Sequence, residues 1–232
     1  MNSKTKTRII IILCILLVVI YIGFKYYCFL KFDESDNLEL SNVKITDKMT
    51  INHIDLDDSE YVTFENMKFK NIFEGYERFN EETDTYKMVL DGEEDEKSKA
   101  IFIGIDDQFV SIINSQKEYK DLSNNVIKKE NIKDDLDFIK YMEKHNEDNV
   151  KFFMSARKQK QIYLVNEFKI FMLPSILYVK EIDGYFRGYI FKTHTNISEI
   201  NILKGNKKYY FTFFGDYTDE FINDFMNSVV IE

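Results

Sequence analysis

The first apolar segment of the chain is an uninterrupted run from Ile9 to Phe24. With the ammonium of Lys25 extended toward water, the run continues to Leu30, which gives about 22 residues and about 33 Å of helix. A helix of this length can cross a bilayer core of about 30 Å. An amphipathic core helix would carry a polar face, and this run has none. Residues 9–30 therefore predict a transmembrane helix.

The flanks of the run predict its orientation and processing. Signal-peptidase cleavage needs small residues, and 24–32 offers none. Cys14 and Cys28 also lack the small residues that precede a lipoprotein cysteine. The run from Ile9 to Phe24 is preceded by three cations, Lys4, Lys6 and Arg8. It is followed by two, Lys25 and Lys31. This bias favours a cytoplasmic N-terminus. We expect a cytoplasmic segment at 1–8, an uncleaved signal anchor at 9–30, and residues 32–232 outside the cell membrane.

The remaining chain predicts a polar stalk at 31–58 and one domain at 59–232. The stalk is acidic and contains one candidate strand near 43–51. Alternating or β-branched runs predict the strands of the domain, at 61–69, 85–90, 100–105, 176–182, 185–192, 197–203 and 208–214. The acidic block at 93–96 predicts a hairpin loop. Asp183-Gly184 and Gly205-Asn206 predict tight turns.

Helical spacing predicts three helices in this domain. Asp134 or Asp135 can cap the first, which should run to His145 with Leu136, Ile139 and Met142 on its apolar stripe. The second is expected at 154–172 and ends before Pro174. The alternative for that segment is two strands, QIYLV and FKIFML.

The third predicted helix lies at the C-terminus. Asp216 or Thr218 can cap it, and Phe221, Phe225 and Val229 recur every four residues along it. It should pack on one face of the sheet. The fold class is therefore α+β: an N-terminal transmembrane helix followed by one domain with a mainly antiparallel sheet and packed helices.

Composition narrows the class of protein. The chain is 44% hydrophobic and 31% charged, so it can bury a core. Its formal net charge is −9, of which residues 1–31 contribute +5, so the remainder carries −14. An acidic domain is not expected to bind nucleic acid. Both cysteines lie in the apolar run, so the domain needs no disulfide. The excess of Lys over Arg, with abundant Ile and Asn, is typical of AT-rich bacterial genomes.

The closing segment, GNKKYYFTFFGDYTDEFINDFMNSVVIE, resembles the end of PsbP-like domains. In that family a hairpin strand ends in a short loop, and a C-terminal helix packs on the sheet. The resemblance covers residues 176–232 and extends loosely to 60–105, while the long segment 112–174 departs from the pattern. It implies a binding or assembly module rather than an enzyme.

Candidate metal and nucleotide chemistry is sparse. The three histidines, His53, His145 and His194, do not share a ligand spacing, so solvated or hydrogen-bonded roles are favoured over a zinc site. Gly104, Gly184 and Gly188 are isolated strand or turn glycines rather than a phosphate loop. The sequence contains no GxSxG elbow. No catalytic, cofactor-binding or metal site is predicted.

The acidic residues include two candidate sites. The run Asp55-Leu56-Asp57-Asp58-Ser59-Glu60 lacks the glycine and glutamate that a helix–loop–helix calcium loop requires at its sixth and twelfth positions, although a casual surface calcium site stays open. Asp106 and Asp107 end the strand AIFIGI. They can cap a loop or, as the alternative, act as an acid–base pair. A small basic patch, Arg157, Lys158 and Lys160, is either a solvated helix face or a contact for lipid headgroups or anionic wall polymers.

Three functions follow as hypotheses. The first is a single-pass membrane protein whose non-catalytic exterior domain binds a protein or envelope partner. The second is an envelope hydrolase with acidic catalytic residues near Asp106. The third is a protective or sensor protein associated with a secreted toxin or signalling system.

Overall fold

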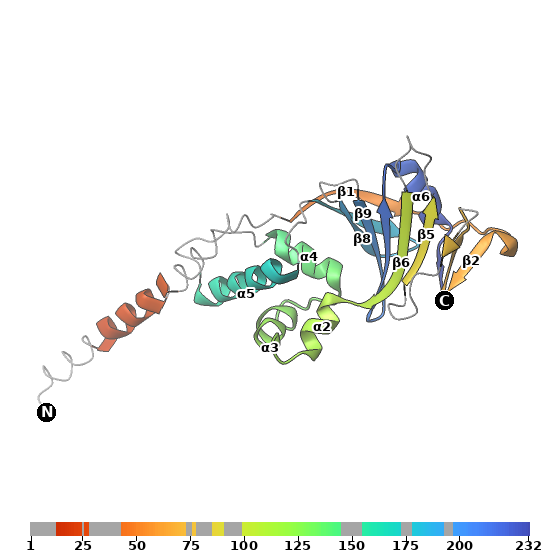
Figure 1. Ribbon diagram of the computed structural model, residues 1–232. Helices are drawn as coiled ribbons and strands as arrows, with labels where there is room; N and C mark the ends of the chain where they lie inside the picture. Colours follow the sequence, from red (N-terminus) through yellow and green to blue (C-terminus); the bar gives the residue numbers. More distant parts are fainter. Residues whose placement is uncertain are drawn as a thin grey trace, which may run out of the picture.

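The computed structural model describes residues 13–24, 26–27, 43–72, 76–77, 85–90, 99–144, 155–172, 178–192 and 197–232. Residues 13–24 of the predicted anchor are helical, and its remaining positions, apart from 26–27, lie outside the described residues. Within the described ranges, no helix combines the length and the apolar character needed to span a bilayer. The domain that follows is α+β with a mainly antiparallel sheet, as predicted (Figure 1).

The domain is built on an eight-stranded sheet with the order β1-β7-β8-β9-β10-β6-β5-β4. Its strands in chain order are β1 (Lys44–Ile51), β4 (Tyr76–Glu77), β5 (Thr85–Leu90), β6 (Lys99–Asp107), β7 (Tyr178–Gly184), β8 (Gly188–Lys192), β9 (Ile197–Lys204) and β10 (Lys207–Phe214). Neighbouring strands are antiparallel except β1 and β7, which are parallel. The C-terminal hairpins predicted from the sequence therefore form the centre of the sheet.

One face of this sheet packs on helix α6 (Asp219–Asn227) and on a small sheet of order β11-β3-β2, formed by β2 (Tyr61–Phe64), β3 (Met67–Lys70) and β11 (Val230–Ile231). Alternate residues of β10 point to this face, so Phe211 and Phe213 are buried there against Phe225 of α6. Thr218 caps α6 by accepting a hydrogen bond from the Phe221 amide at 3.1 Å, as one of the two predicted caps.

The other face is covered by the helical layer, which we define as α2 (Phe109–Ser115), α3 (Lys120–Leu122), the π-helical turn η2 (Ser123–Ile127), α4 (Asp135–Lys144) and α5 (Ala156–Met172). In Figure 1 these green and teal helices gather on the opposite side of the sheet from α6. Tyr189, Phe191 and Val179 of the sheet join their apolar cluster. The sheet thus has two separate cores, one on each face.

Several predicted elements are confirmed. Segment 156–172 is one helix rather than two strands, and Ile162, Val165 and Phe168 are buried along it. Strands β5 and β6 pair as the predicted hairpin, and Gly205-Asn206 joins β9 to β10. The predicted loop at 93–96 lies outside the described residues.

Three predictions need correction. The predicted stalk at 31–58 is too long: β1 pairs with β7 and Ile51 is fully buried, so residues from Val43 onward belong to the domain. The strand predicted at 61–69 is a hairpin, because the backbone turns at Glu65, where φ is +53°. Helix α2 and the turn η2 are omissions rather than wrong predictions, because no element was predicted for the segment that they fill.

The third correction concerns the turn at Asp183-Gly184. These residues still pair with Thr50 and Ile51 of β1, so the connection to β8 falls at 185–187 instead. Gly184 has φ of +98°, and a Cβ there would lie 2.5 Å from the Ile51 carbonyl oxygen. Glycine is needed at position 184 because the backbone of β1 lies too close to leave room for a Cβ atom.

Candidate functional site: the junction between the sheet and the helical layer

Gln108 links the sheet to the helical layer. It lies between β6 and α2 and is only 3% exposed. Its side-chain amide donates to the carbonyl oxygens of Gly205 at 2.9 Å and Lys207 at 3.2 Å. Its amide oxygen accepts from the backbone N–H of Asp135 at 3.2 Å. One buried side chain therefore holds the β9–β10 turn against the start of α4.

Asp135 provides the second connection. This carboxylate is fully buried, and it accepts hydrogen bonds from the Val110 amide at 2.9 Å and from the Tyr189 hydroxyl at 3.3 Å. The residue that precedes α2, Gln108, makes no side-chain cap bond. Asp135 therefore supplies the acceptor that the first turn of α2 needs, from a distant part of the chain.

Burial controls the electrostatics of this network. It raises the pKa of Asp135, although hydrogen bonds from the Val110 and Phe109 amides and the charge of Lys208 oppose the shift. Burial and the nearby Asp135 carboxylate also raise the pKa of Tyr189 well above its ordinary value. Lys208 is 8% exposed, and its ammonium lies 4.6 Å from the centre of the Phe109 ring. The network therefore has a packed, low-dielectric environment.

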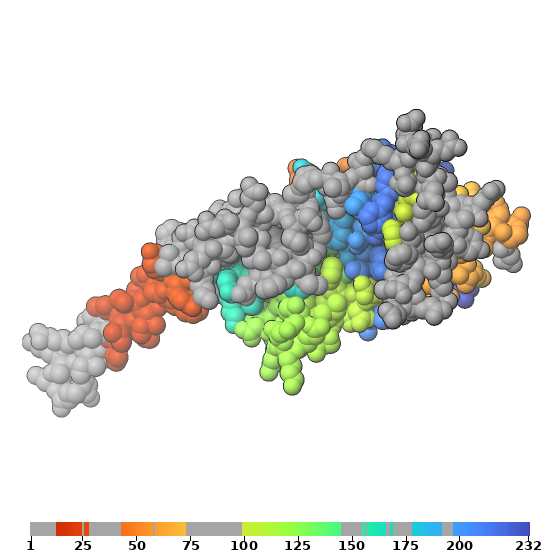
Figure 2. All heavy atoms as spheres, viewed as in Figure 1, coloured from red at the N-terminus to blue at the C-terminus, as the bar shows by residue number. Residues whose placement is uncertain are grey.

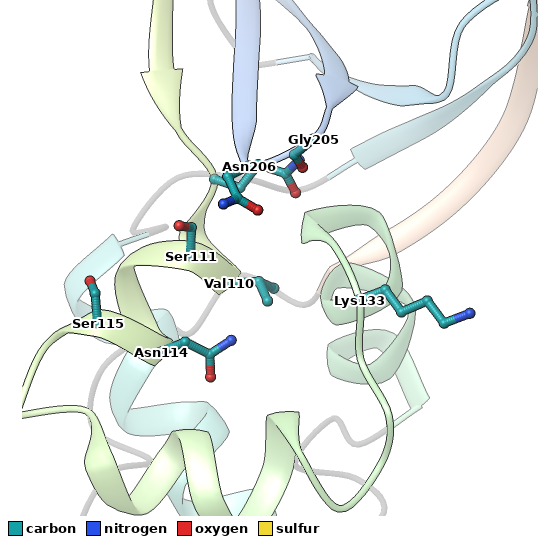
Figure 3. A pocket seen from close by; sticks show the side chains of 8 residues that line it. Val110, Ser111, Asn114, Ser115, Lys133, Gly205 and Asn206 are labelled. Carbon is teal, nitrogen blue, oxygen red and sulfur yellow. The ribbon is translucent and has the colours of Figure 1, made fainter.

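A polar pocket of about 350 Å³ opens beside this junction (Figure 3). Its lining consists of hydroxyl, amide and backbone groups with one apolar and one basic side chain, from Gln108, Val110, Ser111, Asn114, Ser115, Lys133, Gly205 and Asn206. Figure 3 shows Asn206 from the β9–β10 turn and Asn114 from α2 extending toward the same space, while the Lys133 side chain runs away from it. We call this the junction pocket.

A second, charged hollow of about 890 Å³ lies on the other side of Lys133, which lines both. Its rim carries an ion-pair cluster in which Arg187 contacts Asp134 at 2.6 and 3.1 Å and Asp137 at 2.6 Å. Burial opposes ionisation of Asp134, but the hydrogen bonds from Arg187 and from the Asp137 amide outweigh it and lower its pKa. The guanidinium is therefore already satisfied by protein carboxylates.

The junction pocket has the chemistry of a binding site. Its hydroxyl and amide groups can donate to or accept from an uncharged polar ligand. The Ser115 hydroxyl donates to the Ile112 carbonyl of its own helix at 3.0 Å, and the Asn114 amide oxygen accepts from Ser123 at 2.7 Å. The nearby carboxylate of Asp135 caps α2. Among the described residues, no group of His, Cys, Asp or Glu is arranged to hold a metal ion.

The candidate acid pair does not line this pocket. Asp106 and Asp107 are exposed at the end of β6, and Asp107 forms an ion pair with Lys207 at 2.8 Å. His53 lies elsewhere, stacked on the Tyr185 ring at 4.6 Å with Nε2 2.8 Å from Asp55. His145 and His194 lie outside the described residues.

The basic patch is on the outer surface of α5. Arg157 lies 3.8 Å from Glu130, Lys160 lies 3.0 Å from Asp121, and both cations stay largely exposed. Lys158 is also exposed.

Sequence reasoning did not identify Gln108, Tyr189 or Arg187 as residues of a site. The sequence indicates Asp135 only as a possible cap of its own helix. A signal for α2 was present, since Phe109, Ile112 and Ile113 follow the i, i+3, i+4 spacing of a helix. Nothing local in the sequence connects that helix to Asp135.

No known protein family matches the chain, and neither a curated protein nor a solved structure resembles it significantly. The class that the structure defines is an α+β domain with a two-sided core, and the resemblance to PsbP-like domains stays a prediction.

Proposed function

We propose that this chain is a single-pass membrane protein whose α+β domain binds a protein or envelope partner outside the cell membrane without catalysis. The anchor would span residues 9–30 with the N-terminus in the cytoplasm. The domain, from Val43 onward, would present the junction pocket to its partner.

The observation that carries this proposal is the exposure of apolar side chains on the N-terminal helix. The large ones between Leu13 and Phe24 are 49% to 64% exposed, and they include Leu17 at 64% and Val19 at 60%. Isolated apolar side chains on a surface are ordinary, but a continuous row on every side of a helix is not. Lipid is the environment that suits such a helix, and the cations before it favour a cytoplasmic start.

The binding role rests on how the junction is built. Gln108, which lines the pocket, is fixed by long-range hydrogen bonds to Gly205 and Asp135, and the Asn114 side chain is held by Ser123. A rigid polar pocket suits recognition, because its groups lose little freedom when a ligand binds. Asp135 is committed to capping a helix, and Asp107 is paired with Lys207, which favours binding over acid catalysis.

Membrane extraction tests the anchor. The full chain should stay in the membrane fraction after an alkaline carbonate wash and dissolve in detergent. Leu17→Lys together with Val18→Lys should release it, since each lysine costs about 2.5–3.5 kcal/mol at the centre of a bilayer. The control pair Thr46→Lys and Asp47→Lys changes exposed positions of β1 and should stay membrane-bound. Release of the unaltered chain by carbonate would contradict the anchor.

Crosslinking in intact cells tests the binding role. A partner captured by the unaltered chain should be lost when Ser111→Trp fills the junction pocket. Lys117→Trp, at an exposed position outside the pocket lining, should retain it. Capture of the same partner by both variants would show that the pocket is not the binding site.

A further inference from the structure

The helical layer carries a basic surface on an otherwise acidic domain. We define this basic surface by five cations from two neighbouring segments: Lys128, Lys129, Arg157, Lys158 and Lys160. All five are exposed. Residues 32–232 together carry a formal charge of −14, because 1–31 contribute +5 to the total of −9. A positive surface on this domain is therefore a local exception.

Packing of α5 on η2 places the start of α5 beside the segment that carries Lys128 and Lys129. The Gln161 amide donates to the Asn125 carbonyl at 2.7 Å and to the Glu130 carboxylate at 2.8 Å. Lys160 pairs with Asp121 at 3.0 Å across the same contact. Figure 1 shows α5 and α3 adjacent, at the end of the domain opposite the small sheet, and in Figure 2 the teal spheres of α5 meet the green spheres of the preceding helices.

Much of the positive charge of this surface is not neutralised by acids. Lys128 and Lys129 donate to the neutral side-chain oxygens of Asn124 and Asn125, both at 2.9 Å. Arg157 is 61% exposed and lies 3.8 Å from Glu130, a loose contact. Within the described residues, the ion pairs of this surface involve two carboxylates, Glu130 with Arg157 and Asp121 with Lys160. The net charge of the surface is therefore positive and directed toward solvent.

The same layer receives the chain that comes from the proposed anchor. Val43 is 2% exposed and belongs to the apolar cluster that also holds Val165 and Phe168 of α5. The twelve residues between Leu30 and Val43 can span at most about 40 Å. The helical layer is therefore tethered within reach of the bilayer. The C-terminal residue Glu232 pairs with Lys68 of the small sheet, on the other core.

We propose that the basic surface docks on anionic phospholipid headgroups of the membrane that holds the anchor. This inference rests on the proposed function, since the tether supplies the high local concentration that makes weak contacts effective. Each lysine or arginine near an anionic bilayer strengthens association about fivefold. The anionic bilayer repels the acidic remainder of the domain, so docking also fixes the orientation of the domain on the membrane. The helical layer faces the membrane, and the small sheet points away from it.

Energy transfer in reconstituted vesicles tests this proposal. The full chain, with Cys14→Ser and Cys28→Ser, carries a donor dye at Ser155→Cys beside the basic surface or at Glu232→Cys on the small sheet. Vesicles of phosphatidylcholine contain acceptor-labelled lipid, with or without phosphatidylglycerol. Transfer from position 155 should rise with phosphatidylglycerol and fall at high salt, and it should exceed transfer from position 232.

Charge variants identify the surface. Lys128→Gln, Lys129→Gln and Lys158→Gln together should weaken docking about 100-fold, from about fivefold for each lysine. None of these three side chains is in an ion pair within the described residues, so the fold should tolerate the change. The matched triple Lys44→Gln, Lys70→Gln and Lys207→Gln removes the same charge from other exposed positions and should leave transfer unchanged.

Vesicle flotation distinguishes failure of the proposed anchor from failure of the proposed lipid docking. A chain that does not float with vesicles overturns the proposed anchor. A chain that floats, but whose transfer ignores phosphatidylglycerol and the lysine substitutions, overturns lipid docking alone. Binding of the basic surface to a soluble glycerol-phosphate polymer, with no response to anionic vesicles, also overturns it and assigns the surface to a wall polymer.

Discussion

The carboxylate of Asp135 accepts the backbone N–H of Val110 at 2.9 Å, so α2 is capped by a residue 25 positions further along the chain. The same carboxylate accepts the Tyr189 hydroxyl, which comes from the sheet beneath. One side chain thereby joins α2, α4 and β8. The helical layer and the sheet are expected to unfold together for this reason.

Removal of this carboxylate should destabilise the domain. Asp135→Ala leaves two buried donors without an acceptor and should lower the free energy of unfolding by about 2–4 kcal/mol. Asp135→Asn retains one side-chain oxygen and should cost less. Urea unfolding of residues 32–232 measures both, with exposed Asp224→Ala as the control. A loss below about 0.5 kcal/mol for the alanine variant would contradict the capping role.

Asp135 and Asp134 should affect the pH dependence of stability in opposite directions. Because the pKa of Asp135 is raised in the folded state, its contribution to stability is present at pH values below the ordinary carboxyl pKa of 3.8. This contribution is lost as the pH rises through the folded pKa. The lowered pKa of Asp134 means that its contribution is present above 3.8 and is lost as the pH falls. Melting temperatures measured as the pH rises from below 3.8 test both assignments. The melting temperature of the unaltered protein should fall relative to that of Asp135→Asn. It should rise relative to that of Asp134→Asn. Parallel trends would contradict the assignment.

Phe225 should be a major contributor to the core below α6. It is 2% exposed, and its ring lies 5.6 Å from Phe213 and 6.0 Å from Phe69 and Phe211. Phe225→Ala should cost about 3–5 kcal/mol in urea unfolding of residues 32–232. Phe221→Ala, at a half-buried position of the same helix, should cost less. A loss below about 1 kcal/mol for Phe225→Ala would mean that α6 is peripheral.

Thiol labelling should place the domain outside the membrane. With Cys14 and Cys28 replaced by serine, Lys207→Cys in the β9–β10 hairpin should react with a membrane-impermeant reagent in intact cells. Lys207 is exposed, so burial would not block the reaction. Reaction only after lysis would assign the domain to the cytoplasm.

The acid pair at the end of β6 should be dispensable. Asp106→Asn with Asp107→Asn removes one exposed ion pair, to Lys207, and such pairs contribute about 0–1 kcal/mol. Stability and cellular phenotype should therefore change little. A phenotype as severe as deletion, in a variant that still folds, would favour the acid hydrolase hypothesis instead.

Local patterns predicted most of the regular elements correctly. The β9–β10 hairpin follows from Gly205-Asn206 between two alternating strands, and the start of α6 follows from Thr218. Helix α5 follows from the spacing of Ile162, Val165 and Phe168. Each of these signals depends on residues within about one or two turns of chain, and such interactions leave a periodic pattern in the sequence.

The sequence by itself thus determined the apolar N-terminal segment, the charge balance and the antiparallel hairpins. Tertiary structure alone decided that β1 adds in parallel to β7, that Asp135 caps α2, that Arg187 reaches Asp134 and Asp137, and that α5 joins η2 in one basic surface. These contacts join residues far apart in the chain, so the local sequence around one residue does not indicate which distant residue it contacts. Burial then sets their strength, because the pKa of a carboxylate such as Asp135 depends on everything packed around it.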